Sequence, residues 1–251
     1  MDKEHIKEEQ KYQDSIAKYY FESYESDYVK KRWDYPLLEK YLKYVQKGIV
    51  LDLGCGTGAT SYFYSKNNYQ VISSDLSTEM LKKVKERGND SILLNSLAES
   101  IPLKDNSVSH VVCFGAFHHF NNKKKSLEEI NRVLKKNGTL LIVENNSNSL
   151  HKKMIPSVIR DYMQPKFKKK YGESVHEEES HEQTLDDYIN LFQESSLSLK
   201  SVKTFYFARI VSLAEKSSAI KFVFENMLKV MDKIVPKKSG FFVAFLLEKR
   251  N

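Results

Sequence analysis

Apolar positions along this chain follow two alternating periods from about residue 48 onward. Short runs of β-branched and leucine residues predict strands, and the apolar residues between them recur at the three- and four-residue spacing of amphipathic helices. Alternating strands and helices are typical of a parallel sheet with helices on both faces. We therefore predict strands at residues 49–53, 70–74, 92–94, 108–114 and 139–143.

Capping residues and apolar spacing indicate where the helices lie. Ser77 precedes a helical pattern, and Thr184 is followed three residues later by an aspartate. Both are residue types whose side-chain oxygen satisfies the first free amides of a helix. Leu127, Ile130 and Leu134 have the spacing of one buried helix face.

Several segments fall outside the regular alternation. We expect an N-terminal helical lid segment over residues 1–47 and a cap insertion over about 145–183, which lacks strand character. Strand patterns return at 199–207 and 240–247, with a helical insertion at about 211–236 between them.

The strand at 49–53 runs into a turn rich in glycine, with Gly54, Gly56 and Gly58 at alternate positions. Without a Cβ, such a turn lets the backbone lie close to a ligand. Asp52 would repel a pyrophosphate and would attract an ammonium group. S-adenosylmethionine carries an ammonium and a sulfonium and no phosphate, so it suits this turn better than a dinucleotide does.

Asp75 ends the next predicted strand. A carboxylate at that strand tip can accept hydrogen bonds from both hydroxyls of a ribose. The two acidic positions together predict an adenosine ligand with a free ribose.

The order of the later motifs resembles that of the class I S-adenosylmethionine-dependent methyltransferases. After the glycine turn and Asp75, the motifs are residues 98–103, 108–113 with 117–119, and 132–138. The chain is most similar to the subgroup that includes quinone-ring and natural-product methyltransferases of small molecules. Residues 16–20 also resemble the lid segment of that family.

The resemblance implies a Rossmann-like α/β fold: a seven-stranded, mostly parallel sheet with strand seven antiparallel, helices on both faces and a helical cap. The methyltransferase domain would be residues 48–251. The residues expected to bind the cofactor are Tyr19, Tyr20, Asp52, Gly54, Cys55, Gly56, Asp75, Leu76, Leu97, Ala98, Glu99 and Phe114.

The chain departs from the family pattern at two places. Leu97 stands where many relatives have an aspartate for the adenine amino group, so adenine would rely on backbone groups near Ala98 and on apolar contacts. Lys136, Asn137 and Gly138 stand where the family usually has a Pro-Gly-Gly turn, and asparagine keeps the turn because it tolerates left-handed geometry.

The candidates for catalysis are histidines, together with Glu144 at the end of the fifth predicted strand. His118 and His119 follow the fourth strand, and His181 resembles a cap histidine of several relatives. Each could act as a base if the methyl acceptor carries a proton, or could support a loop instead. We expect no metal site, because His176, Glu178 and His181 fit no defined zinc spacing.

Composition agrees with an intracellular enzyme domain. With 251 residues and 41% hydrophobic content, the chain can bury a sizeable core without disulfides. Cys55 and Cys113 suggest no disulfide framework, and no stretch has the pattern of a signal peptide or a membrane span, so we expect a cytoplasmic protein.

The net charge of +7 comes mainly from the C-terminal part, where residues 204–251 hold nine basic and four acidic side chains. Because nearly all the basic residues are lysine, a nucleic-acid partner is disfavoured. The helical insertion has an apolar stripe that could pack on the cap or on a second subunit, or lie on a membrane surface, and we favour packing. We expect a monomer or a homodimer.

The sequence therefore predicts an S-adenosylmethionine-dependent methyltransferase for a small organic molecule, with oxygen, nitrogen or carbon as acceptor. Two alternatives stay open. The lysine excess motivates a tRNA-nucleoside methyltransferase, and the helical insertion motivates a non-catalytic cofactor-binding partner subunit.

Overall fold

The computed structural model describes residues 3–25, 35–146, 184–205 and 242–250. Residues 147–183 of the predicted cap insertion, and all of the predicted helical insertion at 211–236, lie outside the described residues.

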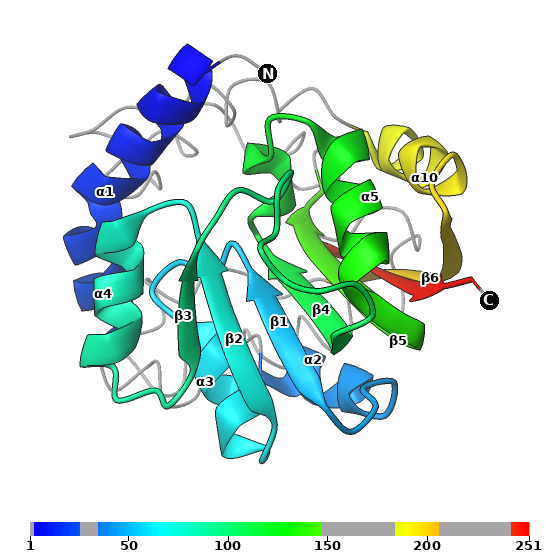
Figure 1. Ribbon diagram of the computed structural model, residues 1–251, viewed down its shortest axis with the longest axis horizontal. Coiled ribbons are helices and arrows are strands. Elements are labelled where there is room, and N and C mark those ends of the chain that lie inside the picture. Colours follow the sequence, from blue (N-terminus) through cyan, green and yellow to red (C-terminus); the bar gives the residue numbers. More distant parts are fainter. Residues whose placement is uncertain (1–2, 26–34, 147–183, 206–241, 251) are drawn as a thin grey trace, which may run out of the picture.

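A seven-stranded sheet forms the centre of the protein, in the order β3-β2-β1-β4-β5-β7-β6 (Figure 1). The pairings from β3 through β5 are parallel, and β7 runs antiparallel to both of its neighbours, as predicted. The strands are β1 (Ile49–Leu53), β2 (Gln70–Asp75), β3 (Ile92–Asn95), β4 (Val108–Phe114), β5 (Leu134–Asn145), β6 (Leu197–Phe205) and β7 (Phe242–Lys249).

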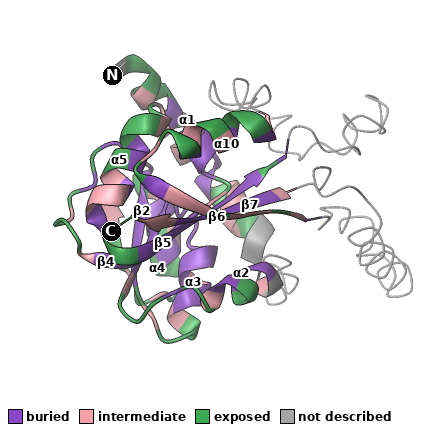
Figure 2. Cartoon of the chain, turned by 90° about the vertical axis from the view of Figure 1, so that its right-hand side faces the viewer, coloured by how far each residue is buried: buried purple, intermediate pink, exposed green. Residues whose placement is uncertain are grey.

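Helices cover both faces of this sheet, and Figure 2 shows the two layers with the buried strands between them. The helices are α1 (Lys3–Glu25), α2 (Tyr35–Leu42), α3 (Ala59–Lys66), α4 (Thr78–Glu86), α5 (Lys123–Val133), α10 (Leu185–Gln193) and the short 3-10 helix η2 (Phe117–His119). Side chains of α5 and α10 share one apolar core with Leu51 and Leu53. Side chains of α2 and α3 share the other with Val50, as the alternation of side chains along a strand requires.

Both predicted helix caps are confirmed. The backbone amide of Met80 donates to Ser77 Oγ over 3.0 Å at the start of α4. Thr184 and Asp187 form a reciprocal capping box at the start of α10.

The predicted start of the fifth strand, at residue 139, is wrong. Leu134 already has an extended conformation and pairs with Val108, and pairing resumes at Thr139 opposite His110. The residues between form a bulge in which Asn137 adopts a positive φ of 60°. Leu134 was expected on the preceding helix because its spacing from Ile130 continues the helical period.

The bounds of the last two strands also differ slightly from expectation. β6 begins at Leu197, two residues before the predicted start, and β7 ends at Lys249, two residues after the predicted end. No helix in the described part of the chain is both long enough and apolar enough to cross a membrane.

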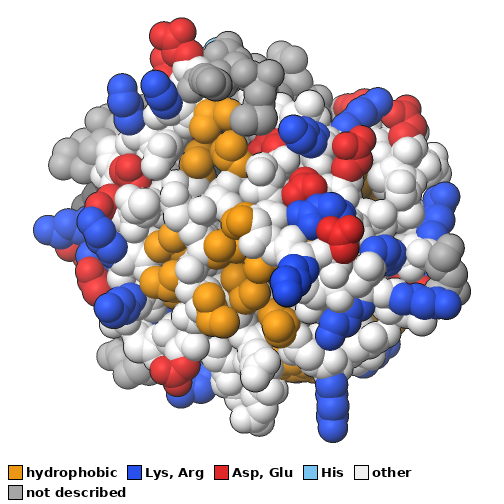
Figure 3. Space-filling view, viewed as in Figure 1, with side chains coloured by type: hydrophobic (Ala, Val, Ile, Leu, Met, Phe, Trp, Pro, Cys, Tyr) orange, Lys and Arg blue, Asp and Glu red, His pale blue; other side chains and the backbone are white. Residues whose placement is uncertain are grey.

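The outer edge of the sheet at β3 is apolar and exposed. Ile92 is 66% exposed and Leu93 37% exposed, and Figure 3 shows apolar side chains gathered on this face of the molecule. The strand has only four residues, which limits the length of free edge that could pair with another chain.

Candidate active site

A cavity of about 290 Å³ lies at the carboxyl ends of the central strands. Its lining includes residues from α1, the turn after β1, the end of β2, the turn after β4 and the end of β5. The chain runs from β1 outward to β2 and β3 and then returns to β4 on the other side of β1. Ligands of open parallel sheets bind at this kind of reversal point, because the loops on its two sides diverge and leave a crevice.

The glycine turn after β1 forms one wall of the cavity. The amides of Gly54 and Cys55 donate to the carbonyl of Ser74, over 2.8 and 2.9 Å, and tie the turn to β2. A Cβ added at Gly56 would meet no atom within 4 Å, although Gly56 has a φ of +52°. The space beside Gly56 is therefore open on the cavity side, as a turn that lies against a ligand requires.

Asp75 holds this turn in place from the tip of β2. The amide of Gly56 donates to Asp75 Oδ2 over 2.8 Å, and the amide of Ser77 donates to Oδ1 over 2.9 Å. Asp75 is 9% exposed, and burial raises the pKa of its carboxyl group against the opposite effect of these two amides. Each carboxylate oxygen has a second lone pair, so the group can still accept hydrogen bonds from a ligand in the cavity.

Residues 96–99, which directly follow β3, form the neighbouring wall of the cavity. Glu99 is buried and accepts a hydrogen bond from the amide of Asn122 over 2.8 Å, which links this wall to the start of α5. The side chains of Leu97 and Ala98 supply an apolar surface beside it.

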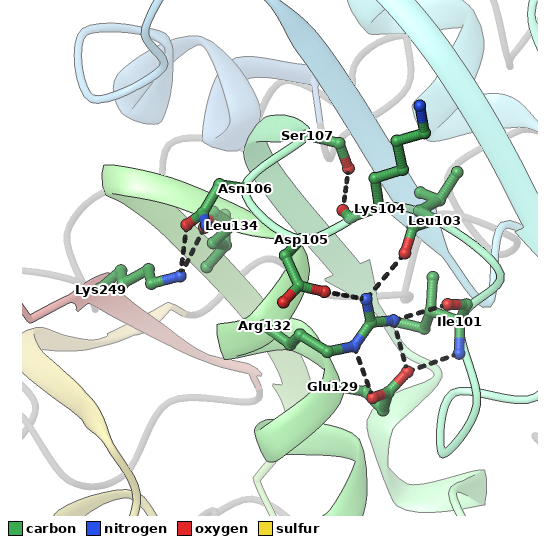
Figure 4. Close-up of polar contacts among 10 residues, drawn as sticks. All are labelled: Ile101, Leu103, Lys104, Asp105, Asn106, Ser107, Glu129, Arg132, Leu134 and Lys249. Atoms are coloured by element: carbon green, nitrogen blue, oxygen red, sulfur yellow. Dashed lines mark hydrogen bonds and ion pairs between the residues drawn. The ribbon is translucent and has the colours of Figure 1, made fainter.

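Arg132 on α5 fixes the chain that follows this wall (Figure 4). Its guanidinium group donates to the carbonyls of Ile101 and Leu103, each over 2.8 Å. It also pairs with Glu129 through two nitrogens at 2.8 Å and with Asp105 at 2.7 Å. The planar fork of arginine makes all these contacts at once, which the single ammonium of lysine cannot do.

We therefore expect Arg132→Lys to lower the free energy of unfolding by about 1–3 kcal/mol, because two carbonyls and two carboxylates lose donors. Urea unfolding of the two proteins measures this loss. An unchanged unfolding midpoint would show that the network does not stabilise the fold.

The same variant should change the response to acid. The hydrogen bonds from Arg132 hold the pKa of Glu129 below its ordinary value of 4.5. The stabilisation from this lowered pKa is fully present above pH 4.5 and is lost as the pH falls through the lowered pKa. Arg132→Lys should therefore lose less stability than the parent between pH 5 and the acid transition.

Two histidines lie side by side in η2, directly after β4. Their rings are 4.0 Å apart between centroids, and both line the cavity. His118 Nδ1 lies 2.7 Å from Glu144 Oε2 at the end of β5. His119 Nδ1 lies 3.0 Å from Glu9 Oε1 on α1.

Helix α1 covers the cavity and is attached to its rim. The hydroxyl of Ser77 donates to Asp14 Oδ1 over 2.5 Å, and Ile16 and Ala17 pack against Met80 of α4. The helix contributes six lining residues, namely Ile6, Glu9, Tyr12, Gln13, Ile16 and Tyr20.

The structure brings most of the predicted site residues to this cavity. The lining includes His118 and His119, and also Tyr20, Gly54, Cys55, Gly56, Asp75, Leu76, Leu97, Ala98, Glu99 and Phe114. Tyr19 is not in the lining and packs against the Ile16 cluster of α1. His181 lies outside the described residues.

Asp52 is also absent from the lining. It is 1% exposed, and Ser61 of α3 donates to its Oδ2 over 2.6 Å. Asp52 shares the sheet face of Val50, which is covered by α2 and α3. The structure therefore shows the Asp52 carboxylate hydrogen-bonded to Ser61 of α3, and its predicted role in cofactor binding stays a prediction.

Several lining residues were not predicted from the sequence, and Glu9 is the charged one among them. Ile6, Glu9, Tyr12, Ile16 and Tyr20 recur at three- and four-residue spacing, so they share one face of α1. A carboxylate within that largely apolar and aromatic face was the signal that could have revealed it.

Part of this chain is similar to known methyltransferases. Residues 51–142 match the family described as "Methyltransferase domain". An uncharacterized protein of Methanocaldococcus jannaschii is 36% identical over 151 residues, which cover 56% of this chain and 64% of the relative. Demethylmenaquinone methyltransferase of Renibacterium salmoninarum is 36% identical over 95 residues, or 38% of this chain and 40% of the relative. The chain thus spans less than two thirds of the length of either relative.

Solved structures show the same fold. An S-adenosylmethionine-dependent methyltransferase from Thermotoga maritima superposes with a TM-score of 0.62 at 17% identity, over 96% of this chain and all of the other.

Proposed function

We propose that this chain is an S-adenosylmethionine-dependent methyltransferase, and that it transfers the methyl group of S-adenosylmethionine to a small, largely apolar organic acceptor. The fold, the open glycine turn and the position of Asp75 support this activity.

The charge of the cavity is the observation that carries the proposal. Glu9, Asp75 and Glu99 line it, and the described lining residues include no lysine or arginine. Carboxylates attract a cationic ligand and repel a pyrophosphate, and the effect is stronger away from bulk water. S-adenosylmethionine carries a sulfonium and an ammonium, whereas a dinucleotide carries phosphates that nothing described in the lining would neutralise.

The residues of the cavity fit this cofactor. Asp75 would accept hydrogen bonds from its ribose, the backbone at Gly56 would lie against it, and Leu97 with Ala98 would contact its adenine. When bound, S-adenosylmethionine supplies a methyl group that is activated by the positive sulfur. The protein contributes alignment and exclusion of water, since an in-line displacement depends mainly on these two factors.

The aromatic part of the lining fits an apolar acceptor. Tyr12 and Tyr20 line it from α1, Phe114 and Val143 from the ends of β4 and β5, and Phe242 from the start of β7. Aromatic side chains at this density favour a flat or hydrophobic molecule. The R. salmoninarum relative, by its name, methylates demethylmenaquinone, which has both properties.

We propose a cytoplasmic enzyme, monomeric or homodimeric, that acts on small molecules. A tRNA substrate and a non-catalytic subunit are the competing functions, and each predicts a different result in the same experiment.

The experiment combines cofactor binding with product detection. Calorimetry should show binding of S-adenosylmethionine and of S-adenosylhomocysteine. Incubation with donor labelled in its methyl group and with separate panels of phenols, hydroquinones and amines should give a labelled product detectable by mass spectrometry. Failure to bind the donor would contradict the proposal. Binding with label found only in added tRNA would favour the RNA enzyme, and binding without any transfer would favour the non-catalytic subunit.

A further inference from the structure

A buried carboxylate at the end of β5 fixes the position of His118 in the cavity. Glu144 is 1% exposed, and its Oε2 lies 2.7 Å from His118 Nδ1. Its other oxygen, Oε1, accepts a hydrogen bond from the amide of Phe117 over 2.7 Å. Both partners belong to η2, so Glu144 sets the conformation of this turn and the orientation of the His118 ring together.

This contact selects one form of the imidazole. An ionised carboxylate can only accept hydrogen bonds, so the proton of neutral His118 lies on Nδ1. Nε2 then carries a free lone pair. The two nitrogens lie on different edges of the ring, and His118 lines the cavity while Nδ1 faces Glu144. Within the described residues, no hydrogen bond to His118 Nε2 is found.

The ring nitrogens of two other histidines have partners that differ from those of His118. Both ring nitrogens of His110 are engaged, by Tyr64 and Thr139, and burial lowers its pKa to about 3. His119 pairs with Glu9, which is on α1 and not on the sheet. His118 combines a carboxylate held by a central strand with a nitrogen available to the cavity.

We propose that His118 is the general base of methyl transfer, that Glu144 is its positioning residue, and that the acceptor is an acidic hydroxyl of the phenolic or enolic kind. This inference rests on the proposed function. The hydroxyl class follows from proton affinity, since an imidazole accepts a proton far more readily from a phenol, with a pKa near 10, than from an alkyl alcohol.

The step balances in atoms and charge. The acceptor oxygen forms a bond to the methyl carbon, and the bond between that carbon and sulfur breaks with its electron pair left on sulfur. The hydroxyl proton moves to His118 Nε2. One positive charge thus leaves sulfur and one appears on the imidazole, where the Glu144 carboxylate stabilises it.

Other titratable groups surround this pair. Burial raises the pKa of both Cys113 and Tyr188, and the Glu144 charge adds to each effect, so neither group ionises in the neutral range. Among the described residues, His119 on η2 lies beside His118, and Glu9 on α1 and Asp75 on β2 interact with His119.

The first test needs no substrate. In protein with S-adenosylhomocysteine added, ¹⁵N NMR of the imidazole should show His118 protonated at Nδ1 and bare at Nε2 at neutral pH. Glu144→Gln should lose this preference, because an amide can both donate and accept. The exposed Glu128→Gln on α5 is the matched control and should keep it. A proton on Nε2 in the parent protein would overturn the proposal.

The second test uses 2-naphthol and a naphthohydroquinone as acceptors. His118→Asn keeps an N–H donor near the Nδ1 position, so the contact with Glu144 and the fold can persist while Nε2 is lost. We expect kcat to fall by about 10²- to 10⁴-fold with KM little changed, and the acid limb of the pH profile to disappear. A kcat within threefold of the parent would overturn the role of His118.

The two proposals fail in different ways. A protein that binds S-adenosylmethionine but methylates amines and neither phenolic probe refutes the acceptor class and leaves the methyltransferase intact. A protein that does not bind S-adenosylmethionine refutes the proposed function itself.

Discussion

Replacing Asp75 by asparagine is expected to weaken S-adenosylmethionine binding by about 100-fold, equivalent to ~2.7 kcal/mol. Hydrogen bonds to a charged group contribute roughly 1.5–3 kcal/mol each, and the ribose hydroxyls would lose a charged acceptor. The variant also removes negative charge from a cavity that is proposed to bind a cation. Calorimetric titration measures the change directly.

The controls separate a binding effect from a folding effect. Asparagine keeps one acceptor for the amide of Gly56 or of Ser77, but its NH₂ group faces the other amide. Thermal unfolding of Asp75→Asn without ligand therefore shows how much of the loss comes from a disturbed turn. Asp90→Asn, at an exposed aspartate, is the matched variant and should bind as the parent does. Affinity within threefold of the parent in Asp75→Asn would refute the assignment of the ribose site.

Alanine substitutions at two positions of the glycine turn should lower the free energy of unfolding by different amounts. A methyl group added at Gly54 would lie 2.5 Å from the side chain of Ala116, at a φ of +72°. Backbone strain and overpacking together should lower the free energy of unfolding of Gly54→Ala by about 2–5 kcal/mol. At Gly56 the added group meets nothing in the protein, so Gly56→Ala should cost only the left-handed backbone penalty of about 1–2 kcal/mol.

The affinity for S-adenosylmethionine should show the reverse order, with the larger loss at Gly56. The side of Gly56 that is empty in the protein is where the proposed cofactor would lie, so Gly56→Ala should lose at least about tenfold in affinity while staying folded, a loss of ~1.4 kcal/mol. Urea unfolding and calorimetry on the same two variants test both statements. Equal stability losses at the two positions, or full affinity in Gly56→Ala, would contradict the role given to this turn.

The sequence predicted those parts of the site that depend on residues close to one another along the chain. The strand ends, the glycine spacing, Asp75 at a strand tip and the serine cap are each determined within a few residues, and the structure agrees with their placement. The start of β5 was missed because Leu134 continues a helical spacing, and the bulge around Asn137 depends on pairing with a distant strand.

Long-range contacts account for the remaining differences. Asp52 has a side chain that the alternation of its strand directs toward α3, and only the packing of Ser61 shows that this face is closed. Glu9 reaches the cavity because α1 packs on α4, a contact across some sixty residues of chain for which no local pattern exists. The pairing of His118 with Glu144 likewise joins the ends of two neighbouring strands.

The acidic lining of the cavity has a consequence for turnover. On the proposed reaction, the donor enters as a sulfonium and leaves as a neutral thioether, so each transfer removes the charge that Glu9, Asp75 and Glu99 attract. The spent cofactor is then held less firmly than a fresh one by the same three side chains. The cavity would thus favour exchange of the product for a new donor molecule without any separate release mechanism. Added salt should screen the attraction between the carboxylates and the donor, and it should screen the most buried carboxylates least.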